Sequence, residues 1–368
     1  NEREAAVVQN LEIIGVQNLQ EVIDYLNGNK KIEKAQIDIL KIFNKKSKEK
    51  LDFSEVKGQE NVKRALEIAA AGGHNCILIG PPGSGKTMIA KRIPTILPDL
   101  TFEESLDVTK IHSISGILDN NIGIVTTRPF RSPHHTISPT SMIGGGRNPK
   151  PGEISLAHYG VLFLDELTEF NRNILESLRE PLENREIIIN RLSGNYRYPC
   201  NFMFVASMNP CPCGYYGDEE KECKCTQQEI HRYLRKISGP LLDRIDIQIQ
   251  VKRPKYEKVS SRERVENSDE IRRRVNKARK IQLERYKNYE IYSNAELTTK
   301  MVAEFCKLDI KSEQLLENAF KKFKLSVRAY ERILKVARTI ADLDGKVDIE
   351  FMHIAEAIQF RGLDKIIN

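Results

Sequence analysis

The sequence predicts an α/β fold in which a mainly parallel sheet lies between two layers of helices, followed by a smaller α-helical domain. Short apolar runs alternate with helical stretches between residues 53 and 251, as they do in buried parallel sheets. A phosphate-binding motif follows the first apolar run. Beyond Lys252 the chain becomes helical and basic, with 14 Lys and Arg against 6 Asp and Glu over residues 252–288.

The individual elements follow from these patterns. Four apolar runs predict strands, at 76–79, 161–164, 202–206 and 245–251. Ser268, followed by two acidic residues, is a plausible N-cap for a helix that continues through Ile281. Helical periodicity extends from there to the end of the chain. At the other end, apolar residues at helical spacing predict helix over residues 1–26, interrupted by Gly15.

Composition limits the class of protein. Of the 368 residues, 40% are hydrophobic and 30% are charged, which is typical of a globular chain with a sizeable core. No run of 18 apolar residues and no secretory signal pattern is present, so we expect no membrane span and a cytoplasmic location. The net charge of +7 permits nucleic-acid binding without requiring it. Because the chain begins with Asn1, we expect a fragment or a processed form.

A basic segment precedes the predicted sheet. Residues 30–50 hold eight lysines and three acidic residues, which indicates a linker. Its lysines are either a solvated surface or a contact for nucleic acid.

The first strand leads into a phosphate loop. Residues 80–87 read Gly-Pro-Pro-Gly-Ser-Gly-Lys-Thr and match the pattern G-x-x-x-x-G-K-[ST], with a strand before it and a helix after it. Glycines let backbone N–H groups surround phosphates, and the helix N-terminus adds positive charge. We expect Lys86 to neutralise the phosphates of ATP and Thr87 to ligate Mg²⁺. The nucleotide-binding set is Gly80, Pro81, Gly83, Ser84, Gly85, Lys86, Thr87 and Met88.

Two acidic residues end the next strand. Asp165 and Glu166 follow the apolar run 161–164, where acids either cap the strand or serve phosphate chemistry. With a phosphate loop upstream, we expect Asp165 to hold Mg²⁺ through water and Glu166 to polarise the attacking water. Asn209, at the tip of the following strand, is the candidate to orient that water, unless it only begins a turn before Pro210.

These motifs, followed by Leu-Leu-Asp-Arg-Ile-Asp at 241–246, resemble those of an AAA+ ATPase. Several stretches resemble, more narrowly, the ComM/YifB family of magnesium-chelatase-like AAA+ proteins: Arg-Pro-Phe-Arg-Ser-Pro-His-His-Thr at 128–136, Gly-Gly-Gly at 144–146, Lys-Pro-Gly-Glu-Ile-Ser-Leu-Ala-His at 150–158 and Asn-Pro-Cys-Pro-Cys-Gly at 209–214. The resemblance covers nearly the whole chain.

The resemblance implies a domain order. Residues 1–50 would be the tail of a Lon-protease-like N-terminal domain, mostly missing here, with a linker. Residues 51–255 would be the AAA+ core, a three-layer αβα sandwich, and residues 256–368 the α-helical lid domain.

The resemblance also implies two trans-acting or sensing arginines. Arg244 would be the arginine finger that reaches a neighbouring subunit's nucleotide, and Arg328 would be the second sensor of the lid domain. Without the resemblance, Arg244 could equally pair with Asp243 or Asp246, and Arg328 could be an ordinary basic helix residue. A trans-acting arginine implies a homo-oligomeric ring, commonly a hexamer.

Two acid-free segments interrupt the sheet pattern. Residues 120–152 include Arg128, Arg131, Arg147 and Lys150, and residues 187–217 contain a predicted hairpin with Arg191 and Arg197 near its tip. The first segment suits contact with phosphate backbones. The resemblance implies loops that face a central pore and grip DNA; the alternative is contact between subunits. His134 and His135 are poor metal candidates because no acidic residues lie nearby.

Four of the seven cysteines lie within fifteen positions, namely Cys211, Cys213, Cys223 and Cys225. Paired thiols at short spacing suit a structural tetrahedral Zn²⁺ site, with disulfides or free thiols as alternatives. The remaining cysteines, Cys76, Cys200 and Cys306, lie in apolar surroundings and are expected in the core.

The resemblance therefore implies an ATP-driven DNA motor, a hexameric helicase for branch migration in recombination or DNA uptake. One alternative is a magnesium-chelatase-type ATPase, although a cysteine knuckle has no obvious use there. Another is a protein-remodelling ATPase.

Overall fold

The computed structural model describes residues 2–7, 11–35, 43, 51–118, 123–191, 194–260 and 264–361. The chain divides into two compact units. The first unit comprises Asn1–Lys48 and Asp99–Arg128, and the second comprises Glu49–Pro98 and Pro129–Asn368.

The described residues of the first unit include the helices α1 (Glu2–Ala5), α2 (Leu19–Leu26) and α6 (Phe102–Ser115). Residues 11–18 are not helical, so the prediction of helix over residues 1–26 was wrong there. The side chain of Asn18 accepts a hydrogen bond from the Glu21 backbone N–H at 3.0 Å, and this N-cap starts α2 afresh. Most of the basic segment 30–50 lies outside the described residues.

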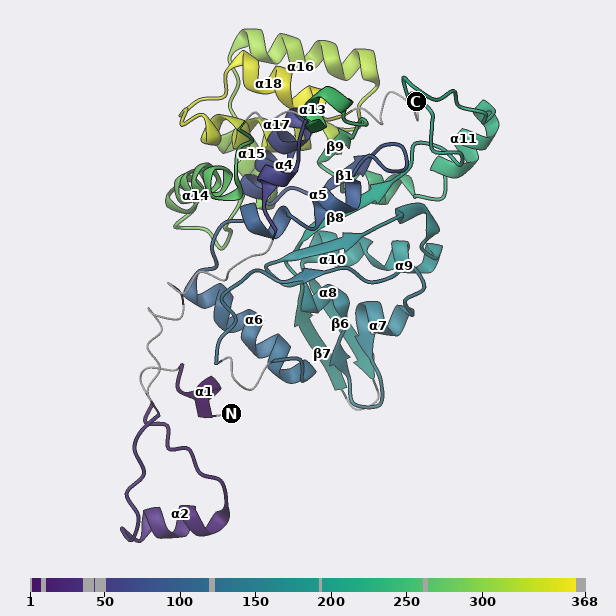
Figure 1. Ribbon diagram of the computed structural model, residues 1–368. Coiled ribbons are helices and arrows are strands. Elements are labelled where there is room, and N and C mark those ends of the chain that lie inside the picture. The colour runs from purple at the N-terminus through teal and green to yellow at the C-terminus, as the bar shows by residue number, and fades with distance from the viewer. Residues whose placement is uncertain are drawn as a thin grey trace. The chain divides into compact units, whose positions relative to one another are not determined.

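The second unit is built on a five-stranded sheet in the order β2-β5-β8-β1-β9 (Figure 1). Its strands are β1 (Cys76–Ile79), β2 (Phe130–Arg131), β5 (Val161–Leu164), β8 (Met203–Met208) and β9 (Ile247–Gln250). All neighbouring strands are parallel. The mainly parallel sheet is therefore confirmed, and β2 is an edge strand that the apolar pattern did not predict.

Side chains that alternate along the strands enter two separate cores, one on each face of the sheet. Cys76 and Leu78 of β1 belong to one core, whereas Ile77 and Ile79 belong to the other. This period of two is what places helices on both faces and produces three layers. The first face is covered by α4 (Glu60–Gly72), α5 (Lys86–Ala90), α14 (Ser268–Arg285) and α17 (Val327–Leu343).

The second face is covered by shorter helices and a hairpin. The helices are α7 (Pro139–Ile143), α8 (Glu153–Leu156), α9 (Arg172–Ser177), α10 (Arg179–Asn184), α11 (Gln227–Leu234) and α12 (Gly239–Leu242). The predicted hairpin is confirmed as β6 (Glu186–Arg191) paired with β7 (Gly194–Pro199), although Leu192 and Ser193 lie outside the described residues. A smaller ribbon pairs β3 (Gly144–Gly145) with β4 (Lys150–Pro151). Three 3₁₀ turns lie at Phe53–Glu55, Ile93–Ile96 and Leu167–Glu169.

The chain after the sheet is helical, as predicted. Its elements are α13 (Tyr256–Ser260), α14, the 3₁₀ turn Asn294–Glu296, α15 (Thr299–Phe305), α16 (Ile310–Phe323), α17 and α18 (Phe351–Gln359). The N-cap of α14 is Asn267 in a capping box with Glu270, and not Ser268 as predicted. Ser268 is buried instead, where its hydroxyl accepts a hydrogen bond from the Phe53 N–H at 2.9 Å.

Candidate functional site

The phosphate loop connects β1 to α5 at the carboxyl edge of the sheet. Gly83 and Gly85 have φ of +76° and +89°, a region that other L residues adopt at a cost. At Gly80, a Cβ atom would lie 2.1 Å from the carbonyl oxygen of Val251, so only glycine fits beside the end of β9. Ser84 is buried, and its hydroxyl has no hydrogen-bond partner among the described residues. The phosphate loop is thus packed against the end of β9 at Gly80, and it keeps a buried hydroxyl at Ser84.

Lys86 brings the loop and the tip of β8 together. Its ammonium donates hydrogen bonds to the carbonyl oxygens of Gly80 and Pro81 at 2.7 and 2.9 Å, and to Asn209 Oδ1 at 3.2 Å. Burial lowers the pKa of Lys86, while the charges of Asp165 and Glu166 oppose that shift. Residues separated by more than a hundred positions in the sequence therefore converge on one cation.

Thr87 and Asp165 meet across the gap between α5 and β5. The Thr87 hydroxyl donates to Asp165 Oδ2 at 2.7 Å. A carboxylate that accepts a hydrogen bond from a hydroxyl ligand can also accept one from a water on the same ion, so this pair fits a magnesium site in which Thr87 binds directly and Asp165 through water. The Ser207 hydroxyl of β8 donates a hydrogen bond to the other carboxylate oxygen of Asp165. The same hydroxyl accepts a hydrogen bond from the Glu166 backbone N–H at 3.3 Å.

Ser207 was missed by the sequence reasoning. The signal was present, since it is the one hydroxyl-bearing residue in β8, whose six residues are all buried. A buried hydroxyl needs a partner, and here the partner is Asp165.

Glu166 stands at the end of β5 with a left-handed backbone, φ +53°. This conformation is uncommon outside glycine, and such residues concentrate at functional sites. The turn separates its exposed side chain from that of Asp165. Met88, the last residue predicted to bind nucleotide, is 40% exposed at the start of α5.

Arg244 lies at the amino ends of the strands, whereas the phosphate loop lies at their carboxyl ends. Its carbonyl oxygen accepts a hydrogen bond from Asn75 Nδ2 at 2.9 Å, and Asn75 immediately precedes β1. Its guanidinium is mostly buried, donates to the Pro240 carbonyl at 2.7 Å and pairs with the carboxylate of Glu183. The partner is therefore Glu183 of α10, and neither Asp243 nor Asp246.

Arg328 lies on the same edge. Its Nη1 is 3.9 Å from Asp243 Oδ2, next to Arg244 in sequence, and its side chain is 58% exposed. The two arginines that the sequence singled out therefore lie near one another and away from the phosphate loop of their own chain.

A buried polar cluster joins β9 to α17 and was also missed. Asp246 is buried, pairs with Arg332, and lies 3.5 Å from His74 Nδ1. Burial alone would raise the pKa of Asp246, but Arg332 and His74 outweigh it and hold that pKa far below its usual range. His74 Nε2 in turn bonds the Thr339 hydroxyl at 2.7 Å.

The two acid-free segments come together on the second face of the sheet. The Tyr198 hydroxyl of β7 donates to the Pro149 carbonyl at 2.8 Å, and a Cβ at Gly144 would lie 3.0 Å from Ile189. Four exposed cationic side chains come from the segments that meet here. We call this set the basic hairpin surface, and it consists of Arg147, Lys150, Arg191 and Arg197. Within the described part of the chain none of these four forms an ion pair. Figure 1 shows β6 and β7 projecting beside α7 and α8.

Two arginines from the first acid-free segment are engaged elsewhere, against expectation. Arg131 forms a two-point ion pair with Glu153, at 2.6 and 2.7 Å. Arg128, in the first unit, pairs with Glu104 at 2.8 Å. Both acidic residues lie outside the acid-free segment, so the composition of that segment did not predict these ion pairs.

The four clustered cysteines converge on one point. The sulfur of Cys211 lies 3.4 Å from that of Cys213 and 3.7 Å from that of Cys223, and all four sulfurs lie within 4.8 Å of one another. Sulfurs bound to one zinc ion at about 2.3 Å are about 3.8 Å apart, so the four donors fit a tetrahedral zinc site. These distances exclude disulfides between them.

The thiols of the cluster do not all shift in the same direction. Burial raises the pKa of Cys223 to about 12. A backbone hydrogen bond from Cys213 lowers the pKa of Cys225, but burial and the neighbouring thiols outweigh it, so that pKa is also raised. Desolvation raises the pKa of Cys213, but N–H donors from Tyr215 and Lys224 outweigh it and lower that pKa to about 6. Thiolate is the form that binds zinc. Burial also raises the pKa of Cys200, Cys76 and Cys306, and the prediction that these three lie in the core is confirmed.

No helix in the described ranges has both the length and the apolar character that a membrane span requires.

The fold and the site define the class of protein. A phosphate loop follows β1, an Asp-Glu pair follows β5 two strands away, and an asparagine follows β8, which lies between them. This arrangement is typical of an AAA+ ATPase. Two family models match, "Magnesium chelatase, subunit ChlI" over residues 52–259 and "Magnesium chelatase, subunit ChlI C-terminal" over residues 265–361.

Similar proteins narrow the class to a family. The chain is 43% identical to the competence protein ComM of Haemophilus influenzae, over all of this chain and 71% of that protein. It is 46% identical to the uncharacterised protein YifB of Escherichia coli, over 86% of this chain and 61% of that protein. A magnesium-chelatase 38 kDa subunit of Rhodobacter capsulatus is 26% identical over 43% of this chain. The chain belongs to the ComM/YifB family of magnesium-chelatase-like AAA+ proteins.

Proposed function

We propose that this chain is an ATP-hydrolysing motor that acts on DNA, a hexameric ring helicase that promotes branch migration in recombination or natural transformation. The observation that carries the DNA assignment is the basic hairpin surface, built from two segments far apart in sequence. The name of the competence protein from Haemophilus influenzae agrees with a role in DNA uptake. The same proposal places the protein in the cytoplasm.

The geometry supports the proposed roles of these residues in hydrolysis. Backbone N–H groups of the phosphate loop and Lys86 hold the phosphates of ATP, and Thr87 and Asp165 hold its Mg²⁺, Asp165 through water. Glu166 polarises the attacking water and Asn209 orients it, since both stand at strand ends beside Lys86. Ser207 positions Asp165. Bound Mg²⁺ supplies charge neutralisation at the phosphates.

The position of Arg244 supports the proposed ring. The phosphate loop follows the last residue of β1, whereas Arg244 lies beyond its first residue, so one strand length of about 13 Å separates the two edges. Arg244 therefore acts on the nucleotide of a neighbouring subunit. Arg328, beside Asp243, shares that edge and is proposed to act in trans as well. A head-to-tail contact of this kind closes into a ring.

The basic hairpin surface suits a phosphate backbone. Arg191 and Arg197 come from β6 and β7, and Arg147 and Lys150 from the adjoining ribbon. Exposed cations with no carboxylate partner keep their full charge for an anion, and each phosphate contact releases counterions. Arg131 is not included, because Glu153 already occupies its guanidinium.

The test is steady-state ATP hydrolysis with and without single-stranded and forked DNA, on protein shown to assemble in the same buffer. We expect strong stimulation by DNA. A double variant, Arg191→Ala with Arg197→Ala, should lose most of the stimulation and retain the basal rate. The matched control, Lys307→Ala with Lys311→Ala, removes the same charge from exposed lid positions and should retain both.

Hydrolysis that is indifferent to DNA in an assembled ring would overturn the proposal. The chelatase-type or protein-remodelling alternatives would then be favoured, the first because magnesium-chelatase subunits are among the similar proteins.

A further inference from the structure

We propose that Arg253 is a positioning residue that ties the phosphate loop to the cysteine loop, residues 211–225, so that zinc in the cysteine loop and nucleotide at the phosphate loop favour each other. The inference rests on nucleotide binding at the phosphate loop, but not on DNA.

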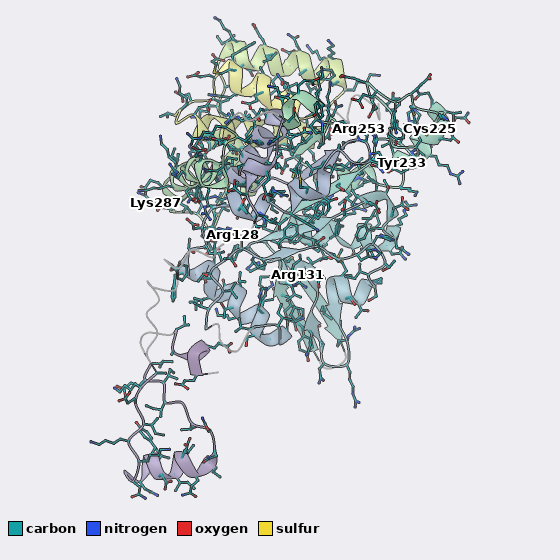
Figure 2. All side chains as sticks on the ribbon, in the orientation of Figure 1. Arg128, Arg131, Cys225, Tyr233, Arg253 and Lys287 are labelled. Carbon is teal, nitrogen blue, oxygen red and sulfur yellow. The ribbon has the colours of Figure 1, made fainter. Side chains whose placement is uncertain are left out.

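Arg253 touches both loops at once. Its Nη2 donates to the carbonyl oxygen of Pro82, in the phosphate loop, at 3.3 Å. Its guanidinium lies over the ring of Tyr215, 5.5 Å from the centroid, and its Nε is 4.0 Å from Asp218 Oδ2. Its Nη1 is 3.7 Å from Glu220. Figure 2 shows Arg253 and Cys225 in the same part of the unit.

A second contact bears on the same proline. Gly214 has φ of +85°, and a Cβ there would lie 2.6 Å from Pro82 Cδ. The backbone of the cysteine loop is therefore packed directly against the Pro82 ring. Pro82 is held on one side by this packing and on the other by the hydrogen bond from Arg253.

A cavity of about 370 Å³ lies between the two loops. Gly80 and Pro81 line it from the phosphate loop, Tyr216 and Gly217 line it from the cysteine loop, and Arg253 lines it as well. Arg253 therefore lies at the border of a space that separates the loops, and its contacts join them across that space.

The cysteine loop also joins the hydrolysis residues. Cys211 follows Asn209 by two positions and is packed in the same core as Tyr233. The Tyr233 hydroxyl accepts a hydrogen bond from Thr168 at 2.9 Å, and Thr168 follows Glu166 by two positions. Tyr233 is marked in Figure 2. A well-ordered cysteine loop would therefore help to fix the ends of β8 and β5, where Asn209 and Glu166 lie.

Metal would supply that order. Four thiolates on one ion close residues 211–225 into a fixed loop, and without the ion the loop must pay conformational entropy to hold Gly214 and Tyr215 in place. By linkage, whatever zinc does for nucleotide affinity, nucleotide does equally for zinc affinity.

The experiment uses the full chain loaded with one Zn²⁺, with a chromogenic chelator to follow zinc release and a fluorescent ADP analogue to follow binding. We expect saturating ADP to slow zinc release about fivefold. Arg253→Ala should weaken ADP binding about fivefold and abolish that protection. Lys252→Ala is the control because it removes the same charge, and among the described residues the Lys252 ammonium forms an ion pair only with exposed Glu219 of the cysteine loop. It should retain both.

Two results would overturn the proposal: zinc release that ADP does not slow although ADP binds, or full protection in Arg253→Ala. Failure to take up Zn²⁺ would overturn it as well. Should Arg253→Ala fail to fold, Arg253→Lys gives the same comparison, because it keeps the charge and loses the planar fork. Absence of any ADP binding would contradict the nucleotide site itself, and absence of DNA stimulation would leave these results unaffected.

Discussion

At the scale of single residues, the nearest carboxylate determines whether an arginine is available to bind a phosphate. Arg131 and Arg191 come from similar acid-free stretches. Arg131 pairs with Glu153, whereas Arg191 forms no ion pair with the described residues. Arg244 pairs with Glu183, whose side chain is itself exposed; in the proposed ring a phosphate would replace that carboxylate.

At Glu166 the test is an isosteric change. Glu166→Gln keeps the shape but removes the base, so we expect ATP hydrolysis to fall at least about 100-fold while nucleotide binding is retained. The measurement is the steady-state rate beside equilibrium binding of a fluorescent nucleotide. Glu169→Gln, three residues on and also exposed, is the matched control and should hydrolyse normally. Equal rates for the two variants would contradict the role of Glu166.

At the scale of elements, a buried polar cluster adds to the apolar core that packs the helical domain on the sheet. α17 contributes Arg332 and Thr339, which meet Asp246 at the start of β9 and His74 after α4. A buried charge of this kind is stable only while its partners are present. The cluster thereby orients the helix that carries Arg328.

We expect Asp246→Asn to lower the free energy of unfolding by about 3 kcal/mol, because it leaves Arg332 and His74 without their counter-charge. The pKa of Asp246 is lowered on folding, so its contribution is present above the unfolded value near 3.9 and is lost as pH falls through the folded value. The loss should therefore be nearly constant from pH 5 to pH 8 in urea denaturation.

The control for that measurement is Glu317→Gln, which removes a carboxylate from an exposed pair with Lys321. Solvent screens such a pair, so the unfolding free energy should barely change. Comparable losses in both variants would show that burial of Asp246 is not the cause.

For the whole molecule, the decisive arrangement is that Arg244 and the phosphate loop occupy opposite edges of one sheet. If Arg244 is the arginine finger that we propose, a chain built this way completes its site only with a second copy. The proposed ring would then be needed for hydrolysis itself.

Mixing two inactive variants tests this requirement. Glu166→Gln and Arg244→Ala rings should each hydrolyse ATP poorly, but a 1:1 mixture should recover up to about a quarter of the wild-type rate if subunits exchange. Each recovered site pairs an intact Glu166 with an intact Arg244 from its neighbour. Subunit exchange is checked by energy transfer between labelled chains. If ATP hydrolysis does not recover although the subunits exchange, Arg244 does not act on the nucleotide of a neighbouring subunit.

Sequence reasoning was most successful where function depends on local spacing. The phosphate loop needs glycines at positions set by the loop itself, and β1 before it and α5 after it lie where the pattern placed them. It was less successful where partners come from distant segments, as with Ser207, the Asp246 cluster and the carboxylates that occupy Arg128 and Arg131.

The sequence by itself determined the fold class, the family, the phosphate loop and the grouping of four cysteines, because each is written in short-range patterns of residue type. Only the tertiary structure decided that Arg131 is occupied and that Arg244 lies across the sheet from the loop. It alone placed Arg253 between the phosphate loop and the cysteine loop. The physical reason is that electrostatic and hydrogen-bond partners act through space, and the crossovers of a parallel sheet bring together residues that are far apart along the chain.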